Sequence, residues 1–111
     1  MARPGWTAAV ALSLLAPASC ARERRPPSVT HTIAMDAVAF QPQALTVRAG
    51  DTIVWVNKDP FPHTATASGG AFDSDQIAPG ASWTWTVSGS GTISYVCRFH
   101  PTMTGTVRVE K

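Results

Sequence analysis

Two histidines, one cysteine and one methionine stand out in this chain because their side chains are soft or borderline metal ligands. Cys97 is followed by His100 three positions later and by Met103 after three more. His63 precedes Cys97 by 34 residues. A thiolate, two imidazoles and a weak thioether are the donor set of mononuclear copper centres. The four residues therefore predict a site for one copper ion.

Three other chemistries would use some of the same residues. A structural zinc site usually has two or more cysteines and no thioether, so Met103 favours copper. Cys97 with His63 or His100 as base would suit a cysteine nucleophile. That alternative gives the methionine no role, and no acidic partner stands near the ligand segment in the sequence. The last alternative is a disulfide between Cys20 and Cys97.

The segments that must position these ligands are short and prone to β structure. From Thr30 onward, turns rich in Gly, Pro, Asn and Asp separate them, and no segment keeps an apolar period of 3.6 residues. This pattern predicts an all-β fold, a sandwich or a barrel, of about seven to eight strands. We place strands at 30–37, 44–47, 52–57, 63–67, 82–87, 92–97 and 105–110.

Two of these strands show which way they face. Within the segment 52–57, the run Ile53-Val54-Trp55-Val56 is apolar on both faces, which is typical of a strand inside a sandwich, and it leads to the loop that carries His63. In the segment 82–87, apolar Trp83 and Trp85 alternate with Ser and Thr, so one face meets the core. We interpret the tryptophans as core residues rather than cofactor contacts, since a small domain needs large apolar groups.

The ligands converge only if two strand ends meet. Cys97 ends the strand 92–97, and a tight turn after it, helped by Pro101, would bring His100 and Met103 to the same point. The remaining ligand, His63, comes from another strand end, where the preceding prolines restrict its loop. The remaining histidine, at position 31, lies outside the set, and we expect it at the surface.

The N-terminal part has the features of an export signal. A short segment with Arg3 precedes the apolar run 7–15, and small residues follow it. This run is far shorter than the roughly 20 apolar residues that span a bilayer. We therefore predict a signal peptide over 1–20, cleaved after Ala18 or, as in lipoproteins, before a lipidated Cys20.

The rest of the chain divides into a linker and one domain. Residues 21–29 are charged and end near two prolines, so we predict a flexible linker there and a single domain over 30–111. We expect an exported, periplasmic protein that meets the membrane only through a lipid anchor at Cys20, if it is anchored. The net charge of +2 comes from the N-terminal arginines: from Ser28 onward there are five Lys and Arg against six Asp and Glu. No basic patch remains, so we expect no nucleic acid partner.

Several motifs together resemble the cupredoxin family of type 1 blue copper proteins, in its amicyanin/plastocyanin-like branch. The resemblance covers residues 30–111. The motifs are Phe40-x-Pro42, Gly50-Asp51, Trp55-x-Asn57, Pro62-His63 and Tyr95-x-Cys97-x-x-His100-Pro101-x-Met103. It implies a Greek-key β-sandwich with one mononuclear type 1 copper ion. His63, Cys97 and His100 would be the strong ligands, and Met103 the axial one.

The resemblance also implies roles for residues around the ligands. Asn57 would tie the two ligand loops together by hydrogen bonds, and His100 would carry electrons through its exposed edge. This chain has Arg98-Phe99 where the amicyanin branch has Thr-Pro. Unlike proline, Phe99 keeps an N–H group, which we expect to donate to the Cys97 sulfur.

The function implied is that of a small exported electron carrier, not an enzyme, that passes single electrons between redox proteins. These partners would dock briefly on an apolar patch around His100, formed by Phe61, Pro62, Phe99 and Pro101. Arg98 beside the patch would favour an acidic partner. The alternative function is copper storage or delivery in the periplasm, which needs most of the same ligands but an exchangeable site.

Overall fold

The computed structural model describes residues 26–111 and three isolated positions, residues 2, 5 and 11. The predicted signal peptide with its Cys20 therefore lies outside the described residues, apart from those three positions, as do residues 21–25 of the predicted linker. Within the described part of the chain, no helix has the length and apolar character needed to cross a bilayer.

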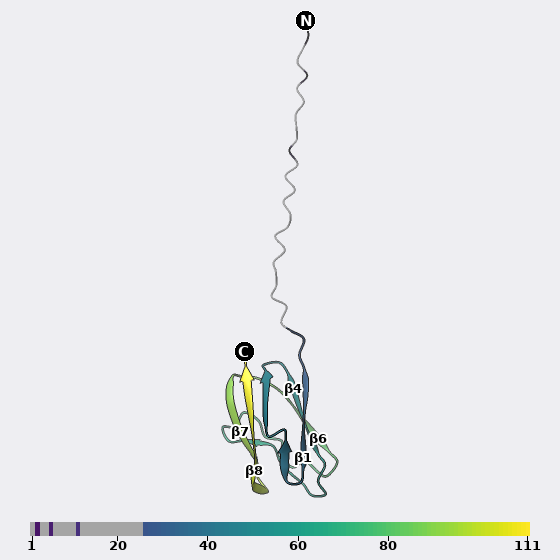
Figure 1. Cartoon of the computed structure of the whole chain (residues 1–111), viewed down its shortest axis with the longest axis vertical. Helices are drawn as coiled ribbons and strands as arrows, with labels where there is room; N and C mark the ends of the chain where they lie inside the picture. Colours follow the sequence, from purple (N-terminus) through teal and green to yellow (C-terminus); the bar gives the residue numbers. More distant parts are fainter. Residues whose placement is uncertain (1, 3–4, 6–10, 12–25) are drawn as a thin grey trace.

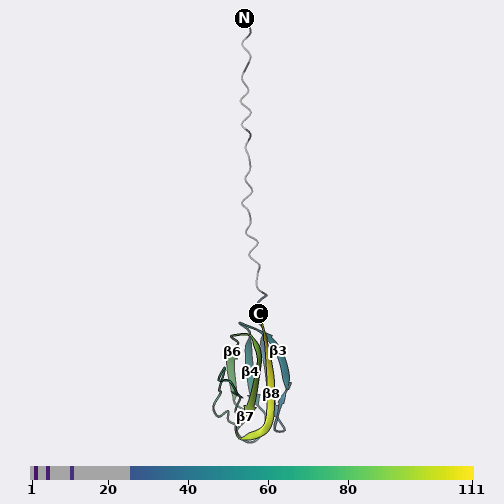
Figure 2. The same cartoon turned by 90° about the vertical axis from the view of Figure 1, so that its left-hand side faces the viewer.

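Eight strands form two four-stranded sheets that pack face to face (Figures 1 and 2). They are β1 (Thr30–Asp36), β2 (Ala39–Gln41), β3 (Ala44–Arg48), β4 (Thr52–Asn57), β5 (Thr66–Ala67), β6 (Ser82–Thr86), β7 (Gly91–Cys97) and β8 (His100–Glu110). The strand order is β2-β1-β4-β6 in one sheet and β3-β8-β7-β5 in the other. Each sheet is mixed, because β1 runs parallel to β4 and β3 runs parallel to β8. The predicted all-β Greek-key sandwich is thus confirmed.

The core is centred on Trp55 of β4, which is fully buried between the sheets. Its ring lies 5.1 Å from that of Phe72, 5.5 Å from that of Trp83 and 5.7 Å from that of Tyr95, measured between centroids. The aromatic rings predicted as core do pack there, as their size and apolar surface require. This core fixes β4 and β7, the two strands that lead into the ligand segments.

Most of the predicted strands agree with the structure, and three features differ. The predicted strand 63–67 shrinks to Thr66–Ala67, and His63 forms only an isolated bridge with Ile77. The short β2 was not predicted. β8 begins at His100 rather than at Gly105, so the segment predicted as a loop is part of a strand.

The chain termini and the predicted copper ligands lie at opposite ends of the domain. The described chain enters at residues 26–29 beside the C-terminus, and β8 begins at the opposite end (Figure 1). At the end with the termini, His31 Nε2 lies 2.9 Å from Asp51 Oδ2, and the His31 side chain is 22% exposed. His31 was expected at the surface, but it is half-buried and held by this carboxylate. The predicted copper ligands lie at the other end.

Candidate metal centre

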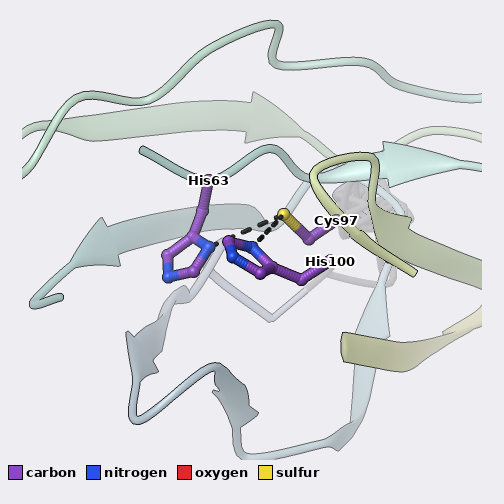
Figure 3. A group of neighbouring side chains, drawn as sticks. All are labelled: His63, Cys97 and His100. Carbon is purple, nitrogen blue, oxygen red and sulfur yellow. Dashed lines mark hydrogen bonds between the residues drawn. The ribbon is translucent and has the colours of Figure 1, made fainter. Parts of the chain in front are cut away.

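Three of the four predicted ligands converge on one point. The Cys97 sulfur lies 3.6 Å from His63 Nδ1 and 3.7 Å from His100 Nδ1, and the three ligand atoms are all within 4.8 Å of one another. Figure 3 shows both rings directed at the sulfur. Cys97 and His63 are fully buried, and His100 is partly exposed. Metal-ligating groups from two distant parts of the chain thus meet at the end of the sandwich.

A two-residue hairpin brings Cys97 and His100 together. The two residues are cross-strand partners in β7 and β8, and Arg98 and Phe99 form the turn between them. The strand register shifts between the pairs Val96–Thr104 and Cys97–His100, so the extra residues 101–103 bulge from β8. The tight turn was predicted correctly, but Pro101 does not form it.

His63 is positioned by a loop rather than by a strand end. Its backbone exchanges two hydrogen bonds with Ile77, from His63 N to Ile77 O (3.2 Å) and from Ile77 N to His63 O (2.7 Å). The Asn57 side chain braces this loop by donating to Phe61 O (2.9 Å) and to Ile77 O (3.0 Å). These two carbonyls flank His63, so its backbone position is set without the metal.

Asn57 does not tie the ligand loops together, contrary to the expectation from the resemblance. Besides the two carbonyls it receives a hydrogen bond from Asp59 N (2.9 Å), and none of its partners lies on the Cys97 hairpin. Thr64 makes that link instead. Its N–H points at the Cys97 sulfur (3.4 Å), and its hydroxyl oxygen accepts from Arg98 N (2.9 Å).

The backbone donor to the thiolate is therefore Thr64 N–H. The expected bond from Phe99 N–H to Cys97 is not among the hydrogen bonds of the described residues. Thr64 was missed in the sequence, where only its place directly after a candidate ligand marked it. A donor on the sulfur draws electron density from the thiolate, which is a means of tuning a metal site.

Asp59 is the second residue that the sequence analysis missed. Its carboxylate is buried and accepts hydrogen bonds from Ala37 N (2.8 Å), Val38 N (2.9 Å) and His63 Nε2 (2.6 Å). Burial alone would raise the pKa of the Asp59 carboxyl, but the hydrogen bonds from Val38, His63 and Ala37 outweigh it, so the pKa lies below its ordinary value. Asp59 is therefore an acidic residue beside the candidate ligands, which the sequence analysis did not expect. Cys97, His63 and Asp59 form a hydrogen-bonded series.

The fourth predicted ligand, Met103, lies on β8 and is 2% exposed. It belongs to the same buried cluster as Cys97. A buried thioether adds the soft, weak donor that distinguishes copper from structural zinc.

The spacing of the three converging atoms suits a shared ion. A thiolate sulfur about 2.3 Å and an imidazole nitrogen about 2.0 Å from one ion lie roughly 3.5–3.7 Å apart at trigonal or tetrahedral angles. The observed separations of 3.6 and 3.7 Å match this range. Cys97 is a free thiol in the described chain, available to bind as thiolate. The donor set and its spacing therefore fit copper.

The surface beside His100 exposes two large apolar side chains, Phe61 (36%) and Phe99 (49%). The Phe61 ring lies 5.5 Å from that of His100 and 5.2 Å from that of His63, between centroids. Arg98, expected to favour an acidic partner, also pairs within the chain. Its Nη2 lies 3.2 Å from Asp75 Oδ1 and 3.6 Å from Asp73 Oδ1, in ion pairs that are exposed to solvent.

Known proteins with this sequence pattern bind copper. The sequence profile of the family "Copper binding proteins, plastocyanin/azurin family" matches residues 27–110. A plastocyanin from Scenedesmus fuscus is 32% identical over 92 residues, covering 67% of this chain and 89% of the relative. An amicyanin from Paracoccus versutus is 27% identical over 89 residues, covering 76% and 67%.

Solved structures of copper proteins also superpose on this chain. A reduced amicyanin in which a proline is replaced by phenylalanine superposes with a TM-score of 0.68 at 27% identity, covering 73% of this chain and 82% of the other. A copper-containing nitrite reductase from Thermus scotoductus also superposes with a TM-score of 0.68, but the match covers only 23% of that enzyme. The profile match and the plastocyanin relative, read with the ligand geometry, show that this chain belongs to the plastocyanin/azurin family of copper-binding proteins and takes one type 1 copper ion as its cofactor.

Proposed function

We propose that the protein is a one-electron carrier whose copper is held by His63, Cys97 and His100, with Met103 as the weak axial ligand. The observation that carries the proposal is the convergence of two imidazoles on one buried thiolate in a site braced by its own hydrogen bonds. Copper bound there would alternate between Cu(I) and Cu(II). Because the chain positions the ligands in advance, little has to rearrange between the two states.

The surroundings support exchange of electrons rather than conversion of a substrate. His63 and Cys97 are fully buried, so solvent and small molecules cannot approach them. His100 is partly exposed beside Phe61 and Phe99, which offers a redox partner a short contact with a ligand edge. An apolar patch of this kind, completed by Pro62 and Pro101, favours brief docking.

A cysteine enzyme is the rival class that the structure makes more concrete. Cys97, His63 and Asp59 stand in the order of a nucleophile, its base and the group that orients the base. However, a nucleophile must reach its substrate, and the Cys97 side chain has no exposed surface. The second imidazole, His100 at 3.7 Å from the sulfur, also has no role in that mechanism.

Copper storage or delivery is the alternative within the same family of sites. Delivery requires ligands that release the ion readily to another protein. Three of the proposed ligands, His63, Cys97 and Met103, are 0–2% exposed, which opposes rapid exchange. We therefore favour the carrier. Slow loss of copper to a chelator would support it, whereas rapid loss would support delivery.

The proposed location is outside the cytoplasm. Export by a signal peptide over 1–20, a linker over 21–29 and anchoring through Cys20 rest on the sequence. In this arrangement the domain over 30–111 would work in the periplasm, free or tethered to the membrane.

The ligand set is tested by substituting each cysteine in turn. The copper-loaded full chain should show an intense blue absorption from thiolate-to-Cu(II) charge transfer and an EPR spectrum with narrow hyperfine splitting. Cys97→Ser should abolish both while the circular dichroism spectrum stays that of a β-sandwich. Cys20→Ser is the matched control and should stay blue. A colourless wild-type protein loaded with Cu(II) would refute the proposal.

A further inference from the structure

The Asp59 carboxylate joins a copper ligand to a turn far from it in the sequence. Oδ1 accepts the N–H of Ala37 (2.8 Å), and Oδ2 accepts the N–H of Val38 (2.9 Å) and the Nε2–H of His63 (2.6 Å). Asp59 is 7% exposed and the His63 side chain is fully buried, so water does not compete for these bonds. Three donors thus hold one buried carboxylate from two sides.

The turn that holds Asp59 has an unusual backbone. Ala37 (φ 53°) and Val38 (φ 56°) form the two-residue connection between β1 and β2, whose flanking residues Asp36 and Ala39 are paired. Positive φ at both positions suits a hairpin turn, but a β-branched valine rarely adopts it. The two bonds to Asp59 offset this cost, and in return the turn fixes where the carboxylate lies.

The Asp59 carboxylate beside Nε2 determines which ring nitrogen of His63 has no proton and can bind a metal. An ionised carboxylate only accepts hydrogen bonds, so Nε2 must carry the proton that it donates. A neutral imidazole has one proton, which leaves Nδ1 bare. Nδ1 is the atom that faces the Cys97 sulfur at 3.6 Å. The ring is therefore set in the tautomer that a metal requires.

We propose that Asp59 is the positioning residue of the copper site: anchored by the Ala37–Val38 turn, it fixes the tautomer and orientation of His63 and places a buried negative charge behind that ligand. This inference rests on the proposed ligand role of His63. A carboxylate behind a ligating histidine raises the basicity of the ligand. Its charge also stabilises Cu(II) more than Cu(I), because the oxidised site is the more positive of the two.

The other end of the domain offers a matched control. Asp51 is 6% exposed and likewise accepts two backbone N–H groups, from Val29 (2.9 Å) and Arg48 (3.0 Å), and pairs with His31 Nε2 (2.9 Å). The two aspartates thus make the same set of contacts at opposite ends of the sandwich. Substituting Asp51 reproduces the structural loss without touching the metal site.

The experiment compares alanine and asparagine at both positions in the full chain. In metal-free protein, the ¹⁵N shifts of His63 should show the Nε2–H tautomer in the wild type and a mixture in Asp59→Ala. The affinity for Cu(I), measured against a competing chelator, should fall about 10- to 100-fold in Asp59→Ala. Asp59→Asn keeps an acceptor but removes the charge, so its reduction potential should rise. Neither Asp51→Ala nor Asp51→Asn should change these three quantities.

Two results would overturn the inference. One is an Asp59→Ala protein that folds and keeps the wild-type tautomer and copper affinity. The other is an Asp59→Asn protein whose potential is unchanged or lower, which decides the matter if the alanine variant does not fold. Failure of the proposed function looks different, because the wild type itself would then not turn blue while the tautomer measurement in metal-free protein would still stand.

Discussion

Thr64 connects the two segments that carry the proposed imidazole and thiolate ligands. Its hydroxyl oxygen accepts from Arg98 N (2.9 Å) and from the Thr66 hydroxyl (3.0 Å), and Thr64 is fully buried. Thr66 in turn contacts Asp73. Because Arg98 opens the hairpin between Cys97 and His100, this single oxygen holds the hairpin against the His63 loop. Its loss would leave the Arg98 N–H without its partner, whereas the Thr66 hydroxyl could still donate to Asp73.

We expect Thr64→Val to destabilise the metal-free protein by about 1–3 kcal/mol, since the side chain keeps its shape while its acceptor is lost. Thr64→Ser keeps the hydroxyl and serves as the control. Urea denaturation followed by tryptophan fluorescence measures the free energy of unfolding. Equal stability of the valine and serine variants would show that the link through the hydroxyl is unimportant.

The proposed ligands were predictable as a candidate set at this scale, and the residues that support them were not. His63, Cys97 and His100 could be proposed because few residue types bind soft metals and because Cys97, His100 and Met103 are spaced three residues apart. Thr64 and Asp59 carry no such signal. Their partners lie 34 and about 20 residues away in the sequence, at Arg98 and in the turn at Ala37, and only folding brings them together.

At the scale of elements, the pairing of β7 with β8 both builds the ligand hairpin and closes the core. Tyr95 is the cross-strand partner of Gly105, and its ring lies against the glycine. A Cβ atom at position 105 would lie 2.4 Å from Cζ of Tyr95. The ring cannot move aside easily, because Phe40 (4.5 Å between centroids) and Trp55 (5.7 Å) pack against it.

Gly105→Ala should therefore destabilise the protein by about 1–3 kcal/mol through overpacking. The effect should appear as a lower thermal midpoint of the metal-free protein. Tyr95→Phe in the same background removes little volume, so it should restore little of the loss. Gly69→Ala is the control, since no atom lies within 4 Å of a Cβ there and its φ is not positive. Equal midpoints for both glycine variants would contradict this account.

The elements that were predicted well have a clear local pattern. The run Ile53-Val54-Trp55-Val56 is apolar throughout, and β4 (Thr52–Asn57) has the predicted bounds. The start of β8 was missed because Pro101 and the expected ligand turn suggested a loop. Proline is tolerated in β8 because the pairing with β7 there consists only of the hairpin end, Cys97 with His100.

For the molecule as a whole, the metal site and the chain ends lie at opposite ends of the sandwich. β8 begins at His100 and ends at Glu110, and eleven residues of strand span about 33 Å. β1 starts from the end where β8 finishes (Figure 1). A tether attached before residue 26 or a group attached after Lys111 would therefore leave the surface around His100 free.

This separation predicts how electron exchange responds to changes at either end. A folded domain fused after Lys111 should leave the self-exchange rate between Cu(I) and Cu(II) forms nearly unchanged, because two copies would still meet through Phe61 and Phe99. Phe99→Lys places like charges on both meeting surfaces and should slow self-exchange by roughly tenfold or more at low ionic strength, with partial recovery in salt. NMR line broadening in mixtures of the two redox states measures both rates. If the fusion slows exchange as much as Phe99→Lys does, electrons leave the molecule by a route other than the exposed edge of His100.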